Sequence, residues 1–162
     1  MALKVELKAG ERVIIGTAVI RNGETRAQLF IEGRTPILRE RDILTPATAD
    51  SPARKIYLAV QMMYLDGDLS QHDSLYFPLV RDFIQAAPSA MELITQINHC
   101  ILDGDLYKAL RAARTLIAYE AELLDALRGE RVQQDRPGHA RAAGAGGGDP
   151  DEGGDPPPGA AR

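Results

Sequence analysis

The sequence is short of several residue types, and each shortage excludes a class of protein. Its 162 residues include a single cysteine, so an internal disulfide and the small disulfide-linked secreted folds are excluded. The longest apolar runs fall far short of the roughly 20 residues that span a bilayer. The amino terminus carries charges throughout and lacks the apolar core of a signal peptide. We therefore expect a soluble, cytoplasmic protein with no membrane partner.

Catalytic and metal-binding motifs are also missing. No phosphate-binding loop, dinucleotide-binding, zinc-protease or nucleophile-elbow pattern occurs. His99 and Cys100 are neighbours on a predicted helix, where they point about 100° apart and cannot form a dyad. Asp-Gly-Asp occurs at 66–68 and 103–105, but the other oxygen ligands of a calcium loop are missing. We predict no enzymatic activity, no metal and no cofactor.

Charge and composition divide the chain into three parts. Residues 1–45 have a balance of +2, residues 46–128 a balance of −4 and residues 129–162 a balance of −2. The net charge of −4 excludes a uniformly basic surface for nucleic acid, but it allows a local basic patch. The last part is mostly Gly, Ala, Pro and Asp, with Val132 as its one large aliphatic residue. We predict that it is a disordered acidic tail.

Residues 1–45 have the pattern of short strands. Apolar and charged side chains alternate over residues 3–7, which is the period of a half-buried strand. Asn22-Gly23 is typical of a two-residue type I′ hairpin turn. The pattern predicts an antiparallel meander of four or five strands. Its apolar face needs a partner, either helices or a second copy of the chain.

After residue 45 the apolar period changes to that of helices, and we predict a fold of the α+β class. A small antiparallel β module (1–45) precedes an antiparallel helical module of about four helices (46–128) and the tail (129–162). Asp50 or Ser51 is expected to cap the first helix, and Ser89 with Glu92 to form a capping box on the third. Pro78 is expected to kink or interrupt the second helix. The expected helices cover residues 51–66, 70–87, 89–102 and 106–127.

Basic residues of the β module are the candidates for binding RNA. Lys4 and Lys8 are on one face of the first strand, and Arg12 follows at the start of the second. Arg39 and Arg41, at i and i+2, are expected to share one face of the last strand. Acidic residues are interspersed, so an ordinary solvated sheet face is the alternative. Few aromatic residues lie on that face, which is unlike the base-stacking sheets of many RNA-binding folds.

The chain resembles the FlbT family of flagellar-biosynthesis regulators. The resemblance depends on LKVELKAGERVIIGTAVIRNG (3–23), LFIEG (29–33), PILRERDILTPATADSPARKIYLAVQMMYLDGD (36–68) and YKALRAARTLIAYEAELL (107–124), and it covers residues 1–128. It implies a small cytoplasmic regulator that represses flagellin synthesis after transcription. The family implies association with the 5′ untranslated region of flagellin mRNA and promotion of its decay.

The opening residues are also similar to the carbon-storage regulator family. The similarity lies in LKAGERVIIG (7–16), the Asn22-Gly23 turn and LFIEGRTPILRERDI (29–43). That family implies a strand-exchanged homodimer of small β-ribbons that binds RNA.

The same similarity implies which residues contact RNA. Aligned on the shared Gly-Glu, the first-strand contacts fall on Val5 and Lys8, and the late basic contact falls on Arg39, with Arg41 close by. With Lys4 and Arg12, these are the candidate RNA-binding residues. A competing hypothesis is that the acidic helical module docks flagellin or another flagellar regulatory protein, without direct RNA contact.

Overall fold

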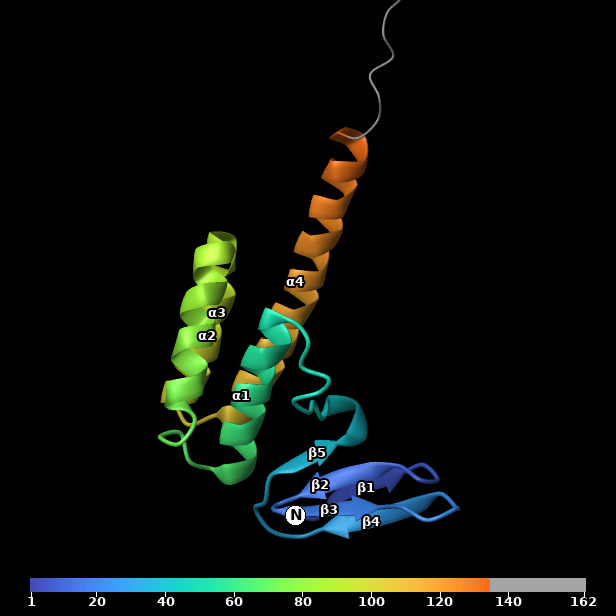
Figure 1. Cartoon of the computed structure of the whole chain (residues 1–162). Helices are drawn as coiled ribbons and strands as arrows, with labels where there is room; N and C mark the ends of the chain where they lie inside the picture. The colour runs from blue at the N-terminus through green and yellow to red at the C-terminus, as the bar shows by residue number, and fades with distance from the viewer. Residues whose placement is uncertain (135–162) are drawn as a thin grey trace, which may run out of the picture.

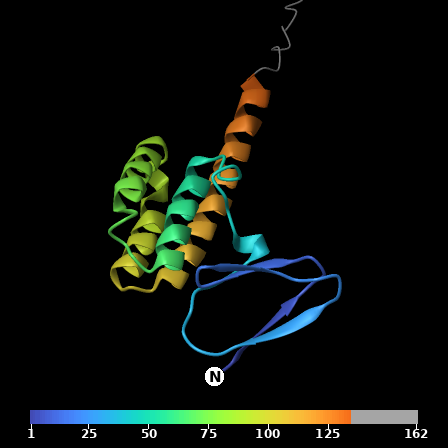
Figure 2. The same ribbon diagram turned by 60° about the horizontal axis from the view of Figure 1, so that its bottom comes forward.

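The computed structural model describes residues 1–134, and it confirms an α+β fold in which a small β module is followed by four helices (Figure 1). The β module lies at one end of the helical bundle in both views (Figure 2). Its elements are β1 (Leu3–Leu7), β2 (Arg12–Ile15), β3 (Ala18–Arg21), β4 (Ala27–Ile31), β5 (Ile37–Arg39) and the short 3-10 helix η1 (Glu40–Asp42). The helices are α1 (Pro52–Asp66), α2 (Asp73–Ala86), the 3-10 turn η2 (Pro88–Ala90), α3 (Met91–Leu102) and α4 (Leu106–Gln134).

The strands do not form the predicted meander. They make two antiparallel sheets, one of β1 with β4 and one in the order β3-β2-β5. Consecutive strands pair only at β2 and β3, whereas β1 reaches across to β4 and β2 to β5. The prediction was wrong because it joined neighbours in sequence, and alternation of side chains does not specify which strand is the partner.

Asn22 explains why its segment is not the predicted hairpin. Its side-chain amide donates to the carbonyls of Leu7, Lys8 and Thr25, at 3.2, 2.7 and 2.8 Å. Asn22 therefore fastens the end of β1 to the segment that leads into β4. The tight turn lies instead between β2 and β3, at Gly16, whose φ of 62° is available to glycine at little cost.

Both faces of strand β2 are covered within one chain. Val13 faces the β1–β4 sheet and forms a small core there with Val5 and Leu7. On the opposite face, Ile14 and Leu38 pack against the core of the helical bundle. The sequence pattern did not specify what covers the apolar side chains of the β module. For β2, the second sheet covers one face and the helices cover the other.

The first helix begins as its sequence predicts, but the second and third begin differently. Ser51 caps α1, because its hydroxyl accepts a hydrogen bond from the Arg54 backbone at 3.3 Å. Helix α2 begins at Asp73, not at residue 70, and runs through Pro78 without a restart. Ser89 does not form the expected capping box, since it lies in η2 and its hydroxyl bonds to that of Tyr119.

Helix α4 is longer than predicted, because it runs to Gln134 and includes the first six residues assigned to the tail. It packs against α1 and α3 through Ala109, Leu110, Ala113 and Leu116. Further along the helix, Leu124 and Leu127 are 46% and 54% exposed. Its last turns project beyond the other helices (Figure 1). The remainder of the predicted tail, 135–162, lies outside the described residues.

Candidate nucleic-acid interface

Three adjoining hollows follow the junction between the β module and the start of α4. Their volumes are about 350, 400 and 440 Å³. Tyr107 lines all three, and Arg41 and Asp42 line two of them. We call the three together the basic groove. Its charged residues are Lys4, Arg34, Arg39, Arg41, Asp42, Asp105, Arg111 and Arg114.

The lining of the groove has more basic than acidic side chains, although the whole chain is negative. It gathers six basic side chains and two acidic ones, whereas the net charge of the chain is −4. Asp105 is in part neutralised by an ion pair with Lys108 at 2.9 Å. Arg34, Arg39 and Arg111 form no ion pair with any residue of the described chain, 1–134. Cations that lack an internal partner are available to an anionic ligand.

A partly buried hydrogen-bond network lies along one wall of the groove. The Tyr57 hydroxyl donates to the carbonyl of Asp42 at 2.6 Å, and the Arg114 guanidinium donates to the Asp42 carboxylate and to the Tyr57 hydroxyl. Partial burial would lower the pKa of Arg114, but these hydrogen bonds outweigh it and raise that pKa. Arg114 is therefore a permanent cation held in place, while Arg41 is 75% exposed and only loosely paired with Asp42 at 3.7 Å.

Four of the six predicted candidates meet at this groove. Lys4, Val5, Arg39 and Arg41 line the same hollow. The structure corrects two details of the prediction. Val5 is only 3% exposed, so its side chain belongs to the core beneath the groove and offers almost no surface to RNA. Arg39 and Arg41 do not share a strand face, because β5 ends at Arg39 and Arg41 lies in η1.

Lys8 and Arg12 lie outside the groove. Lys8 is exposed just beyond the end of β1, where its backbone N–H donates to Glu11 at 2.8 Å. Arg12 is held by Glu40 through its backbone N–H at 3.1 Å and its Nε at 2.9 Å. These hydrogen bonds lower the pKa of the Glu40 carboxyl, first through the backbone N–H and then through the side chain of Arg12. Arg12 is thus hydrogen-bonded to Glu40 within the β module.

The groove also contains residues that the sequence analysis did not select. Tyr107, Arg111 and Arg114 come from the helical module, whose overall charge balance is −4. Their spacing of i, i+4 and i+7 places all three on one face of α4. That spacing, in YKALRAAR, was a signal available in the sequence.

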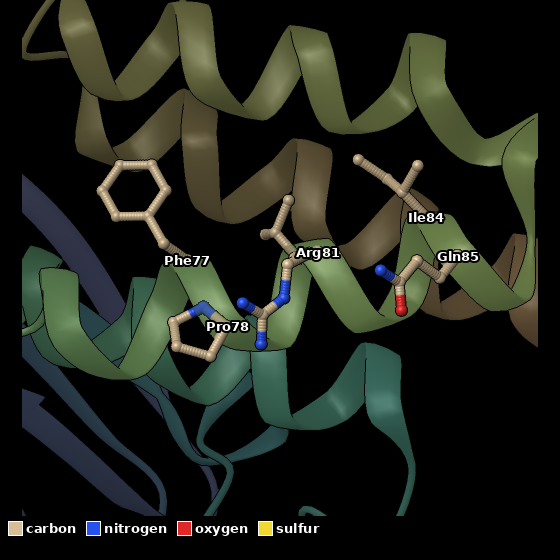
Figure 3. A pocket seen from close by; sticks show the side chains of 6 residues that line it. Phe77, Pro78, Arg81, Ile84 and Gln85 are labelled. Atoms are coloured by element: carbon tan, nitrogen blue, oxygen red, sulfur yellow. The ribbon is translucent and has the colours of Figure 1, made fainter.

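Two other hollows are apolar. The larger, about 520 Å³, lies on α2 alone beside Phe77, Pro78 and Ile84, and its one cation, Arg81, pairs with Asp82 at 3.4 Å (Figure 3). The second, about 450 Å³, lies between α1, α2 and α4 and is lined mostly by apolar side chains, among them Leu124 and Leu127. Neither gathers groups that could bind an anion or carry out a reaction.

Within residues 1–134 no cluster of three His, Cys, Asp or Glu side chains is placed to hold a metal ion. No helix in the same stretch is both long enough and apolar enough to pass through a bilayer.

Comparison with known proteins identifies the family of the chain. The sequence matches the family described as "Flagellar protein FlbT" over residues 3–124. The chain belongs to the FlbT family. It is 57% identical over 124 residues to the "Probable flagellum biosynthesis repressor protein FlbT 1" of Bradyrhizobium diazoefficiens, covering 76% of this chain and 85% of the relative.

Other members of the FlbT family are more distant but match along nearly their whole length. The Rhodopseudomonas palustris relative is 51% identical over 124 residues, covering 76% of this chain and 98% of its own. The "Flagellum biosynthesis repressor protein FlbT" of Caulobacter vibrioides is 34% identical over 132 residues, covering 76% and 90%. No solved structure matches the chain. The matched residues of this FlbT-family chain include every residue of the basic groove.

Proposed function

We propose that this protein represses flagellum biosynthesis in the cytoplasm by binding the 5′ untranslated region of flagellin mRNA in the basic groove and promoting decay of that mRNA. The gathering of six cationic side chains in one groove of an acidic protein is the observation that supports it. Contacts with phosphates supply much of the affinity for nucleic acid. The names of the relatives supply the repressor role.

A titration with RNA tests this proposal. Full-length protein is titrated with a flagellin 5′ untranslated RNA and with a scrambled RNA, each at two salt concentrations. We expect binding that depends on the RNA sequence and weakens as salt rises. The Arg41→Ala and Arg111→Ala variants should each bind several-fold more weakly and lower the salt slope by about 0.7–0.9 for each phosphate that is no longer neutralised.

Arg81→Ala is the matched control. The Arg81 side chain is 69% exposed, much like the 75% of Arg41, but it lies on α2 away from the groove. It should leave both the affinity and the salt slope unchanged. An equal loss with Arg81→Ala, or no RNA binding at low salt, would overturn the proposal.

A second candidate function is that of an adaptor that binds flagellin or another flagellar regulatory protein. The apolar groove between α1, α2 and α4 favours it, because Leu124 and Leu127 are about half exposed there. Leu124→Arg should abolish binding to purified flagellin and leave RNA binding intact. If purified flagellin binds wild type and variant equally, or not at all, this groove is not the flagellin site.

We also propose that two chains form a homodimer through the β module. All four residues of β3 are exposed, including Val19 at 65%, and β3 pairs only with β2 among the described strands. An uncovered apolar edge strand is ready to pair with another strand. Light scattering should give twice the mass of the chain at micromolar concentration, and Val19→Lys should give the monomer. A monomeric wild type would remove the proposal.

A further inference from the structure

Tyr107 occupies the centre of the basic groove. It is the second residue of α4, its side chain is 51% exposed, and all three hollows of the groove share it as a wall. No other residue of the described chain lines all three. A large aromatic side chain is thus presented to solvent at the point where the cations gather.

The Tyr107 ring packs against a second tyrosine, Tyr64. Its centroid lies 5.9 Å from that of Tyr64, with the two planes inclined by 50°. Tyr64 is itself anchored to β5, because its hydroxyl accepts from the Ile37 N–H at 3.0 Å and donates to the Ile37 carbonyl at 3.3 Å. Tyr64 thus links Tyr107 to the β module, and about half of the Tyr107 residue, 51%, remains exposed.

Planar cations line the same hollows as the ring. Arg111 is one turn further along α4 on the same helix face, and Arg41 lines two of the hollows that Tyr107 also lines. Nucleobases stack on aromatic rings and on guanidinium planes, while phosphates pair with the charges. The groove therefore has both elements of a site for a nucleotide.

We propose that Tyr107 is a base-stacking platform, and that the basic groove consequently takes RNA with an unpaired base in preference to duplex RNA. In a duplex both faces of each base are covered by neighbouring bases, so the Tyr107 ring has nothing to stack on. The inference rests on the proposed RNA-binding function and adds which form of RNA is bound.

The experiment compares a single-stranded oligonucleotide with the duplex of the same sequence, using full-length protein and a 2-aminopurine base as fluorescent probe. The wild type should prefer the single strand and quench the probe. Tyr107→Leu should weaken single-strand binding about tenfold, abolish the quenching, and leave the duplex affinity and the salt slope unchanged. Tyr107→Phe keeps the ring and should behave as the wild type.

Phe77→Leu is the matched control, because Phe77 is an aromatic residue on a helix and is 57% exposed. It should change nothing. If Arg41→Ala weakens binding but Tyr107→Leu does not, RNA binding stands and the stacking platform is disproved. If no RNA binds, the proposed function itself fails. If Tyr107→Leu does not fold, the wild type alone tests the platform. The platform is disproved if the probe is not quenched in the bound wild type, or if the wild type binds single strand and duplex with equal affinity.

Discussion

Arg114 and Asp42 are 72 positions apart in the chain, and a hydrogen bond between their side chains joins α4 to η1. Together with the bond from Tyr57 to the Asp42 carbonyl, it fixes the helical bundle to the β module at the edge of the basic groove. The same carboxylate therefore has two effects. It holds the two modules together, and it reduces the positive charge of the groove.

These two effects should separate in the Asp42→Asn variant. Removing the charge should lower the free energy of unfolding by about 1 kcal/mol, since Arg114 is half exposed and its pairing is screened. RNA affinity at low salt should rise about two- to fivefold, because the groove gains a unit of positive charge. Urea denaturation and RNA titration measure the two. Asp82→Asn on α2 is the control, and weaker RNA binding by Asp42→Asn would contradict the prediction.

The pKa of Glu40 should depend on its hydrogen bonds with Arg12. The pKa of Glu40 is lowered from its ordinary 4.5. A carboxyl with a lowered pKa stabilises the fold above its unfolded pKa, and that contribution is lost as the pH falls through the folded pKa. In Arg12→Ala the Glu40 pKa should rise only part of the way, because the backbone N–H of residue 12 still donates. NMR titration measures it, and an unchanged Glu40 pKa would contradict the assigned side-chain contact.

Glu120 should stabilise the start of α1 from a distance in sequence. Its buried carboxylate accepts from the Ser51 hydroxyl at 2.6 Å and from the Ala53 N–H at 3.0 Å. Glu120→Ala leaves these donors without their partner, so the free energy of unfolding should fall by about 2 kcal/mol. The exposed neighbour Glu122→Ala should change it by less than about 0.5 kcal/mol. Equal effects of the two variants in urea denaturation would count against this role.

Tyr76 should make the protein sensitive to alkali. Burial raises the pKa of its hydroxyl, which donates to the Asn98 side chain at 2.7 Å. Above about pH 10 the unfolded chain loses this proton while the folded chain keeps it, so stability falls as the pH rises. Tyr76→Phe should cost about 1 kcal/mol at neutral pH and should lose less stability between pH 9 and 11. Urea denaturation curves between pH 9 and 11 measure the free energy of unfolding of both proteins. Equal losses of stability in the wild type and Tyr76→Phe would contradict the role given to Tyr76.

The sequence predicted what local interactions determine. Ser51 before Pro52 specifies the start of α1 through a cap three residues away, and Ile94, Ile97 and Ile101 are buried as their helical spacing requires. Such signals lie within one or two turns of a single element.

Relations between distant elements were not predictable in the same way. Asn22 followed by Gly23 is typical of a hairpin, but here the Asn22 side chain bonds to carbonyls at the end of β1, a tertiary contact that overrides the local preference. Arg111 was overlooked because the balance of charge over a whole module conceals a basic face on one helix. Only the packing of α4 beside η1 shows that it shares a groove with Arg41.

Helix α4 is long enough that charges at its distal end are screened from the basic groove. From Tyr107 to Gln134 the helix rises about 40 Å at 1.5 Å per residue, roughly five times the screening distance in physiological salt. Charges at the distal end of the helix therefore hardly change the potential at Tyr107. A fluorescent or affinity tag placed at residue 134 would sit well clear of a bound RNA, so that labelling there should leave the binding curve undisturbed.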